Sequence, residues 1–201
     1  ANLVNNGSSD NCTTVSLAAS PTTFDCSKEG DNTVTLTVTD AVGNTATCAA
    51  TVHVDDVTVP TAFCQDITVQ LDANGDASIT ASQVDNRSSD ACGVASLSVT
   101  PSAFDCTNVG SNAVTLTVTD VNGNTADCVA NAEVEDNVAP FADCIAKTVQ
   151  LDVNGQASIV GSDINDASSD ACGIASLDAN PSTFDCSDLA GVSSLLTVTD
   201  V

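Results

Sequence analysis

The sequence is very poor in aromatic residues and in large flexible apolar ones. It contains no Trp, no Tyr and no Met, and only five Phe among 201 residues. Because glycan-binding surfaces usually present aromatic rings, this composition argues against glycan recognition as the first function. The core has to be built from Ala, Val, Leu and Thr, and small domains with such cores depend on cross-links for stability.

Basic residues are almost absent as well. Lys28, Arg87 and Lys147 stand against 27 acidic residues, which gives the chain a net charge of -24. Nucleic acid and anionic lipid are therefore excluded as partners, because binding to phosphate requires clustered Lys and Arg. Divalent cations are the natural counter-ligand of such a chain.

The chain also lacks an apolar run that is long enough to span a membrane, which takes about 20 residues. We therefore expect no direct membrane insertion in this segment. Disorder is excluded, because 42% of the residues are hydrophobic, several segments alternate strictly, and ten cysteines recur in register. Abundant cysteine indicates an oxidising, extracellular location.

What the chain does have is an internal repeat of 80 residues. The motif Ser-Ser-Asp-Ala-Cys-Gly at 88–93 returns at 168–173, and its first three residues and its cysteine occur at 8–12. The motif Thr-Leu-Thr-Val-Thr-Asp at 115–120 likewise matches residues 35–40. Self-similarity at a fixed period is the signature of an array of like modules.

The period divides the chain into three repeats. The second repeat, 58–137, is expected to be a complete module. The first repeat, 1–57, matches only the later part of a module and lacks its first strands, and the third repeat, 138–201, stops before the last strand. The chain is therefore expected to be a window on a longer head-to-tail array, whose partners are neighbouring modules of the same kind.

Hydrophobic alternation predicts short strands throughout the second repeat. Apolar and polar residues alternate over 66–71 and again over 113–119, and Asn-Gly at 74–75 is a strong hairpin signal. No segment has the pattern of a long helix. Several short strands separated by turns predict an all-β fold of small antiparallel, immunoglobulin-like β-sandwich modules. The third repeat loses its Gly-Ser-Asn turn and is expected to pair differently over 189–195.

Histidine occurs only once, so the side chain that most often serves in acid–base catalysis is scarce. His53 lies at an outward position of its expected strand, and the equivalent residue of the second repeat is Glu133. No serine has a recurring base beside it, so the combination of nucleophile, base and orienting residue that hydrolases use is missing. The sequence predicts a protein that is not an enzyme and has no catalytic residue.

Several motifs in register resemble hyalin-type (HYR) repeats. They are Pro-x-x-x-Cys-x-Asp-Ile-Thr-Val at 60–69 and Thr-Val-Thr-Asp-x-x-Gly-Asn-Thr-Ala-x-Cys at 117–128. Leu-Asp-x-Asn-Gly at 71–75 and the Ser-Ser-Asp-Ala-Cys-Gly motif resemble more narrowly the tandem repeats of very large cell-surface adhesins of Bacteroidota, including those of gliding motility. The resemblance implies an immunoglobulin-like fold, export to the cell surface and a role in adhesion.

The four cysteines of the second repeat allow three pairings within that repeat. Cys92 and Cys106 bracket one strand and a proline turn, and Cys64 and Cys128 lie on the first and last strands, which adjoin in immunoglobulin-like sandwiches. We therefore expect disulfides within each module. The predicted pairs are Cys12–Cys26, Cys64–Cys128, Cys92–Cys106 and Cys172–Cys186, with the partners of Cys48 and Cys144 outside this window.

A rival scheme joins neighbouring modules covalently. It pairs Cys48 with Cys64 and Cys128 with Cys144 across the linkers, so that every cysteine finds a partner within the chain. Spacing alone does not decide between the two schemes.

Acidic residues are expected to gather where modules meet. Oxygen-rich clusters of this kind suit calcium, which takes six to eight oxygen ligands in irregular geometry. The alternative is that Asp and Asn stand there because turns favour them and acidic surfaces stay soluble. The first junction would gather Asp55, Asp56, Asp120 and Asn124, and the second would gather Asp72, Asn74, Asp76, Glu135, Asp136 and Asp200.

Two functions remain. The first is a structural repeat region of an extracellular adhesin or filament, in which disulfide-stapled modules extend a stalk or assemble a fibre, with lateral association of chains. The second is an array of glycan- or protein-binding modules that act through variable pole loops, since residues 5–7, 85–87 and 165–167 differ while the framework around them does not.

Overall fold

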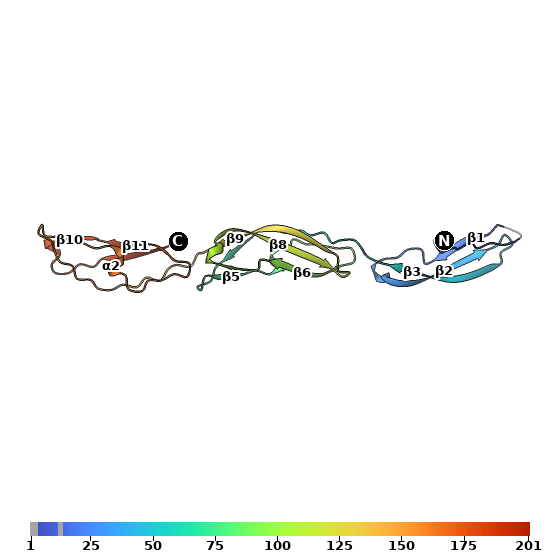
Figure 1. Cartoon of the computed structure of the whole chain (residues 1–201), viewed down its shortest axis with the longest axis horizontal. Helices are drawn as coiled ribbons and strands as arrows, with labels where there is room; N and C mark the ends of the chain where they lie inside the picture. Colours follow the sequence, from blue (N-terminus) through green and yellow to red (C-terminus); the bar gives the residue numbers. More distant parts are fainter. Residues whose placement is uncertain (1–3, 12–13) are drawn as a thin grey trace. The chain divides into compact units, whose positions relative to one another are not determined.

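The computed structural model describes residues 4–11 and 14–201, and these residues form an all-β protein (Figure 1). Two one-turn helices, α1 (Ala81–Val84) and α2 (Gly161–Ile164), and three 3-10 turns, η1 (Cys26–Lys28), η2 (Cys106–Asn108) and η3 (Cys186–Asp188), accompany the strands. None of the helices in this described part is long and apolar enough to cross a membrane. The predicted fold class is confirmed.

The contacts divide the chain into two compact units. The first compact unit comprises Ala1–Ala62, Ser88–Leu97 and Val118–Ala126, and the second comprises Phe63–Arg87, Ser98–Thr117 and Asp127–Val201. The first unit contains an antiparallel sheet of three strands in the order β1 (Ser16–Ser20), β2 (Gly30–Thr39) and β3 (Thr45–Val54). Val34 and Leu36 of β2 are the buried apolar side chains of this sheet.

The second repeat forms a β-sandwich of two sheets. One sheet has the order β4-β9-β8-β6 and the other pairs β5 with β7. The strands are β4 (Ile67–Gln70), β5 (Asp76–Ser78), β6 (Val94–Thr100), β7 (Ala103–Asp105), β8 (Gly110–Asp120) and β9 (Thr125–Glu135). β4 pairs in parallel with β9, with Ile67 opposite Ala132, so the first and last strands adjoin as predicted.

Alternation decides which residues of this sandwich are buried. Val114, Leu116 and Val118 of β8 are each 0% exposed, while the residues that alternate with them are exposed or half-buried. Phe104 of β7 is 4% exposed and is the aromatic residue of this core. Since successive side chains of a strand point to opposite faces, the polar threonines of β8 fall on the outer face.

The third repeat has the same plan with fewer strands. β10 (Gln156–Ser158) pairs with β12 (Thr183–Asp185), and β11 (Ile174–Asn180) pairs with β13 (Leu195–Asp200). Its core is Ile159, Ile164 and Leu196, with Phe184 packed beside them. β13 begins at Leu195, whereas its counterpart β8 begins five residues earlier in register, so the predicted change over 189–195 is confirmed.

Candidate functional site

Two disulfides join neighbouring repeats. Cys26 bonds Cys92 with 5.2 Å between their Cα atoms, and Cys106 bonds Cys172 with 5.1 Å. Both bonds span 66 residues, so they are equivalent positions of the sequence repeat. A third disulfide, Cys64–Cys128, lies within the second repeat and is confirmed as predicted.

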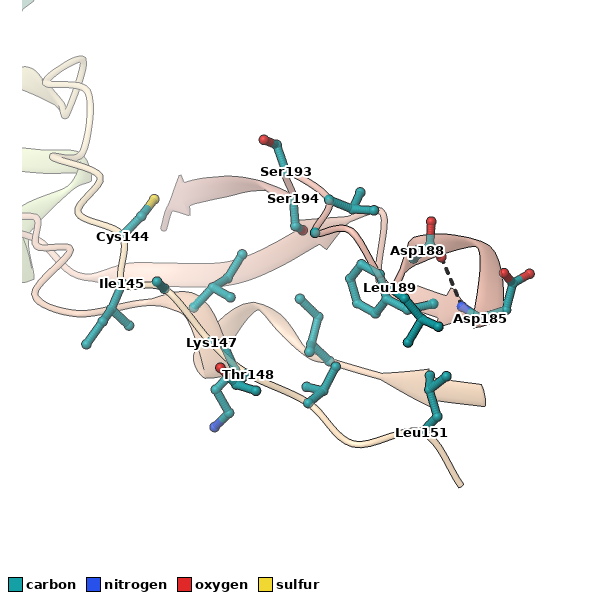
Figure 2. Close-up of a pocket in the computed structure, with 17 residues that line it drawn as sticks. Cys144, Ile145, Lys147, Thr148, Leu151, Asp185, Asp188, Leu189, Ser193 and Ser194 are labelled. Atoms are coloured by element: carbon teal, nitrogen blue, oxygen red, sulfur yellow. Dashed lines mark hydrogen bonds between the residues drawn. The ribbon is translucent and has the colours of Figure 1, made fainter. Parts of the chain in front are cut away.

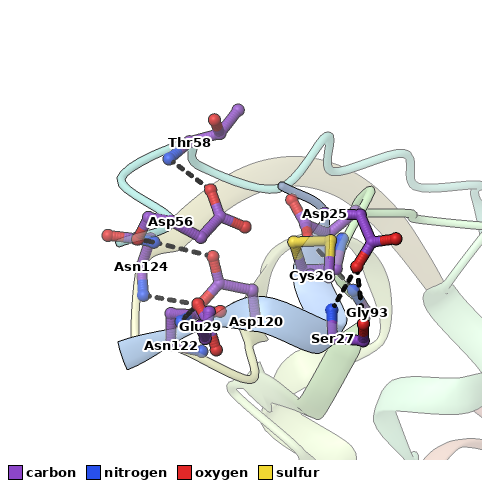
Figure 3. Close-up of a disulfide and its surroundings, with 12 residues drawn as sticks. Asp25, Cys26, Ser27, Glu29, Asp56, Thr58, Gly93, Asp120, Asn122 and Asn124 are labelled. Atoms are coloured by element: carbon purple, nitrogen blue, oxygen red, sulfur yellow. Dashed lines mark hydrogen bonds between the residues drawn. A yellow bond between two sulfur atoms is a disulfide. The ribbon is translucent and has the colours of Figure 1, made fainter. Parts of the chain in front are cut away.

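Short capped turns position one cysteine of each cross-repeat bond. Cys26 is the first residue of η1, and the Asp25 carboxylate before it accepts hydrogen bonds from the Ser27 hydroxyl at 2.6 Å and from the Ser27 amide at 2.9 Å (Figure 3). These bonds hold the pKa of Asp25 below its ordinary value. Asp105 caps η2 before Cys106 in the same way through Thr107.

The recurring Ser-Ser-Asp-Ala-Cys-Gly motif positions the other cysteine. The Asp90 carboxylate accepts hydrogen bonds from the amides of Cys92 at 2.7 Å and Gly93 at 3.1 Å, which closes the loop around Cys92. The Asp170 carboxylate does the same for the amides of Cys172 and Gly173, at 2.7 and 3.2 Å. The motif thus positions its cysteine to form a disulfide with the preceding repeat.

The predicted pairs Cys92–Cys106 and Cys172–Cys186 are wrong. The chain does not fold back at the proline turn, because β6 belongs to one sheet and β7 to the other. β6 alone has seven residues, and at about 3.3 Å each these span more than 20 Å, beyond the reach of a disulfide. Cys92 and Cys106 therefore face opposite neighbours.

The other predicted cysteine pairs are also not found in the structure. Cys12 lies outside the described residues, and Cys26, its predicted partner, bonds Cys92 instead. The rival pairs Cys48–Cys64 and Cys128–Cys144 are wrong, because Cys64 bonds Cys128. Cys48, Cys144 and Cys186 are exposed and form no disulfide within residues 4–11 and 14–201.

The Asp72–Asp76 hairpin turn packs against a cross-repeat disulfide. A Cβ atom placed on Gly75 would lie 2.5 Å from Cys106 Sγ and 3.3 Å from the Ala171 side chain. Gly75 also has a φ of +78°, which L side chains rarely adopt. Both the backbone conformation and the close approach of the disulfide therefore require glycine here.

Beside each of these disulfides lies a pair of carboxylates. Ligand atoms of Asp56, Asp90 and Cys92 lie within 4.8 Å of one another, and those of Asp136, Asp170 and Cys172 repeat the arrangement. Because both sulfurs are disulfide-bonded, neither can act as a thiolate ligand, so only oxygen donors remain. We call these two carboxylate pairs the junction sites.

One oxygen in each junction site is buried without a partner. Asp56 Oδ1 accepts a hydrogen bond from the Thr58 amide at 2.9 Å, while Asp56 Oδ2 is buried and accepts none. Asp136 repeats this, with Val138 as the donor to Oδ1 at 3.0 Å and Oδ2 again buried and unpaired. A buried carboxylate oxygen beside a second carboxylate is a position that a bound cation would stabilise.

Asp120 and Asn124, predicted for the first junction, lie next to Asp56 (Figure 3). Asn124 Nδ2 donates to the Asp56 carbonyl at 3.1 Å and to Asp120 Oδ2 at 2.8 Å. Asp120 is 1% exposed. Burial opposes its ionisation, but hydrogen bonds from Asn124 and from the turn amides outweigh it and lower the pKa of Asp120. Asp120 thus holds Asn124 against the linker backbone and does not belong to the carboxylate pair.

Asp55 is engaged elsewhere. Its carboxylate lies 2.9 Å from Nε2 of His53, and Asp31 lies 2.6 Å from Nδ1 of the same ring. The hydrogen bond to Asp31 and the charge of Asp55 raise the pKa of His53. All three side chains are more than half exposed, so this is a surface cluster.

The ligands predicted for the second junction are only partly gathered. Asp72 Oδ1 accepts hydrogen bonds from the amides of Asn74 at 2.8 Å and Asp76 at 3.1 Å, which close the hairpin turn and lower the pKa of Asp72. Glu135 accepts a bond from Gln70 at 2.6 Å. Asp200 ends β13 opposite Ile174.

Of the ten predicted ligands, only Asp56 and Asp136 therefore belong to a group of acidic residues that could hold a metal among the described residues. The two residues that sequence reasoning missed are Asp90 and Asp170. The available signal was the fixed position of this aspartate two residues before the cysteine in the recurring motif.

Comparisons with known proteins add little to this geometry. No family model and no curated protein matches the chain. Among solved structures, the chain is similar to one described as "Protocadherin gammaB7 EC3-6 cis-dimer structure", with 19% identity and a TM-score of 0.34. The match covers 70% of this chain and spans 46% of the length of that one.

Proposed function

We propose that this chain is a structural segment of an extracellular surface protein, an adhesin or filament, whose tandem modules are joined by disulfides across their boundaries. The three disulfides found among residues 4–11 and 14–201 support a location outside the reducing cytosol. The motif resemblance to hyalin-type repeats and to Bacteroidota surface adhesins, including those of gliding motility, agrees with this role. No residue is assigned a catalytic task.

The observation that carries the proposal is the overlap of the disulfide loops. Each loop overlaps the next one in sequence, because Cys26–Cys92 overlaps Cys64–Cys128 and Cys64–Cys128 overlaps Cys106–Cys172. The shortest covalent path from Cys26 to Cys172 crosses one disulfide, follows the chain from Cys92 to Cys106, and crosses the next. A pulling force on such an array runs through that short segment of each repeat, and most of the repeat is shielded from it.

Peptide mapping of the protein recovered from its source cells tests this proposal. Labelling of intact cells with a membrane-impermeant biotin reagent should tag the protein, and digestion without reduction should release the linked peptides of Cys26–Cys92 and Cys106–Cys172. The within-repeat bond Cys64–Cys128 is the internal control, because both of its cysteines lie in the second repeat and it does not report on the joining of neighbouring repeats. Cross-repeat cysteines found as free thiols, or a protein protected from the reagent, would contradict the proposal.

We further propose that each junction site binds calcium. The support is the pair of buried, unpaired oxygens, Asp56 Oδ2 and Asp136 Oδ2, which recur at equivalent positions beside a second carboxylate. Linker carbonyls and water would complete the shell that calcium requires. Since the sites lie beside cross-repeat disulfides, bound calcium would stiffen the joint that the disulfide already holds.

Calcium should raise the stability of the chain. At a calcium concentration 100 times the dissociation constant, one occupied site contributes about 2.7 kcal/mol. Titration calorimetry should find heat of binding for the chain and none for the Asp56→Asn, Asp136→Asn double variant, and a chelator should lower the melting temperature of the former only. The matched control is Asp76→Asn, which removes an acidic charge outside the junction sites. Equal binding by all three proteins would refute the assignment.

A further inference from the structure

Two carboxylates lie close to one sulfur atom of each cross-repeat disulfide. The ligand atoms of Asp136, Asp170 and Cys172 lie within 4.8 Å of one another, so each carboxylate has an oxygen within that distance of Cys172 Sγ. The first junction site repeats this arrangement with Asp56 and Asp90. Because carboxylates carry a negative charge at neutral pH, two like charges flank one sulfur of each bond.

The other sulfur of the second cross-repeat bond is covered by a hairpin turn. Gly75 is buried, and a Cβ atom placed on it would lie 2.5 Å from Cys106 Sγ. The backbone of the turn therefore leaves no room for a further group against this sulfur. A small molecule that attacks the bond has to approach it from the side of Cys172, past the two carboxylates.

The same cover recurs in the third repeat. A Cβ atom placed on Gly155 would lie 2.8 Å from Cys186 Sγ. Figure 2 shows the capped turn that positions this sulfur, in which the Asp185 amide donates a hydrogen bond to the Asp188 carboxylate at 2.9 Å. A hairpin turn against the sulfur that follows the capping aspartate is thus a recurring feature of the repeat.

Reduction of a disulfide by a thiol brings negative charge to both sulfurs. A thiolate attacks one sulfur, and the other sulfur leaves with the electron pair of the broken bond. If Cys172 is attacked, the thiolate arrives beside the two carboxylates, and if Cys106 is attacked, Cys172 leaves as an anion beside them. Since this charge forms within 4.8 Å of two like charges, the carboxylates oppose both routes.

The within-repeat disulfide has no carboxylate pair of this kind in the described part of the chain. Neither Cys64 nor Cys128 belongs to a group of acidic residues and cysteines whose ligand atoms meet. Both cysteines are half-buried, as are Cys106 and Cys172. The exposure of the cysteines therefore does not distinguish the two bonds, whereas the neighbouring carboxylates do.

We propose that the carboxylate pairs shield the cross-repeat disulfides from reduction by anionic thiols, so that such thiols reduce the within-repeat bond first. A thiol with a negatively charged end is repelled through its end as well as its sulfur, whereas a positively charged end is attracted. The inference rests on the cross-repeat disulfides of the proposed function and is independent of calcium. Loss of the within-repeat bond alone leaves the short covalent path from Cys26 to Cys172 intact.

The test compares two thiols of the same length on the whole oxidised chain, with a chelator present. Cysteamine carries an ammonium group, and mercaptoethanesulfonate carries a sulfonate group. Two thiol molecules reduce one disulfide, because the first forms a mixed disulfide and the second displaces the remaining cysteine and leaves as the oxidised dimer of the thiol. Alkylation of the released cysteines, followed by mass spectrometry at successive times, gives a rate for each disulfide.

The rate with cysteamine divided by the rate with mercaptoethanesulfonate is the charge preference of a disulfide. We expect this ratio to be about tenfold larger at Cys106–Cys172 than at Cys64–Cys128, because charges about 5 Å apart near a protein surface change a rate by this order. Comparison within one molecule removes the intrinsic reactivity of the two thiols and the general field of a chain with a net charge of -24. Equal ratios at the two bonds would overturn the proposal.

The double variant Asp136→Asn, Asp170→Asn separates repulsion from a structural role. Asparagine keeps an oxygen that accepts the hydrogen bonds from the amides of Val138 and Cys172, while the charge is lost. The ratio at the second cross-repeat bond should fall to that of the within-repeat bond. The first cross-repeat bond, whose own carboxylates are unchanged, should keep its ratio and is the internal control.

Two other outcomes would contradict the inference in different ways. If the double variant were reduced faster by both thiols and kept its ratio, the carboxylates would only hold the joint together, and the proposed shielding would be overturned. Peptides of the unreduced chain are mapped before the reaction. Absence of the cross-repeat bonds at that stage would overturn the proposed function together with this inference, whereas equal ratios at bonds that are present would overturn this inference alone.

Discussion

Pulled from handles placed just outside Cys26 and Cys172, the intact chain should reach a separation of only about 50 Å between these residues after its modules unfold. The covalent path runs through the 14 residue steps from Cys92 to Cys106, and an extended chain covers at most about 3.5 Å per residue. After reduction the path follows all 146 residue steps from Cys26 to Cys172, so the extension should reach about 500 Å. Single-molecule force spectroscopy measures both lengths.

Two cysteine variants make this measurement specific. Removal of the within-repeat bond by Cys64→Ser and Cys128→Ser should leave the extension at about 50 Å, because the short path does not use that bond. Removal of a cross-repeat bond by Cys106→Ser and Cys172→Ser forces the path through longer stretches of chain and should raise the extension to about 250 Å. If the two double variants extended equally, the cross-repeat bonds would not be the links that transmit the pulling force.

The same bonds constrain the unfolded chain. In the chain-entropy model, closing a loop of 66 residues contributes about 4 kcal/mol to stability. This is a large contribution for modules whose cores contain one Phe and otherwise aliphatic side chains. Disulfides that cross the repeat boundary thus stabilise two modules at once.

Leu116→Ala should lower the free energy of opening of the second repeat by about 3 kcal/mol. Leu116 is 0% exposed at the centre of β8. The chain contains no Met, the flexible side chain that most readily fills a cavity, so the core collapses poorly around the space that Leu116 leaves. The variant therefore loses both the transfer free energy of Leu and the packing around it.

Amide hydrogen exchange of peptides from residues 94–135 is the right measurement, because a chain of several modules does not melt in one transition. Val129→Ala is the matched control, since Val129 lies in β9 of the same sheet but is 68% exposed. Its opening free energy should change by less than about 0.5 kcal/mol. Equal effects of the two substitutions would contradict the sandwich core described above.

Sequence patterns predicted the features that are local. The alternation over 113–119 placed β8 and its buried residues, and Asn-Gly at 74–75 placed a hairpin turn whose backbone requires glycine. The loss of the Gly-Ser-Asn turn in the third repeat correctly indicated the late start of β13 at Leu195. Each of these depends on side chains within a few residues of one another.

The disulfides and the junction sites could be predicted only in part. Cys64–Cys128 followed from the adjacency of the first and last strands, which the parallel pairing of β4 with β9 bears out. The pairing of Cys92 with Cys106 failed, because it assumed that the chain folds back at Pro101. Asp90 and Asp170 were not predicted as ligands, because no local pattern shows which carboxylate of the next repeat lies beside a linker aspartate.

By itself, the sequence determined that this protein is an acidic all-β array with an 80-residue period. It also determined that cysteine recurs at four fixed positions of the repeat and that aromatic residues are scarce. These properties follow from composition, alternation and repetition, which need no knowledge of long-range contacts. Only the tertiary structure decided that Cys106 bonds the following repeat and that Asp136 meets Asp170. The physical reason is that the chain passes from one sheet to the other between β6 and β7, which sends the two cysteines toward opposite neighbours.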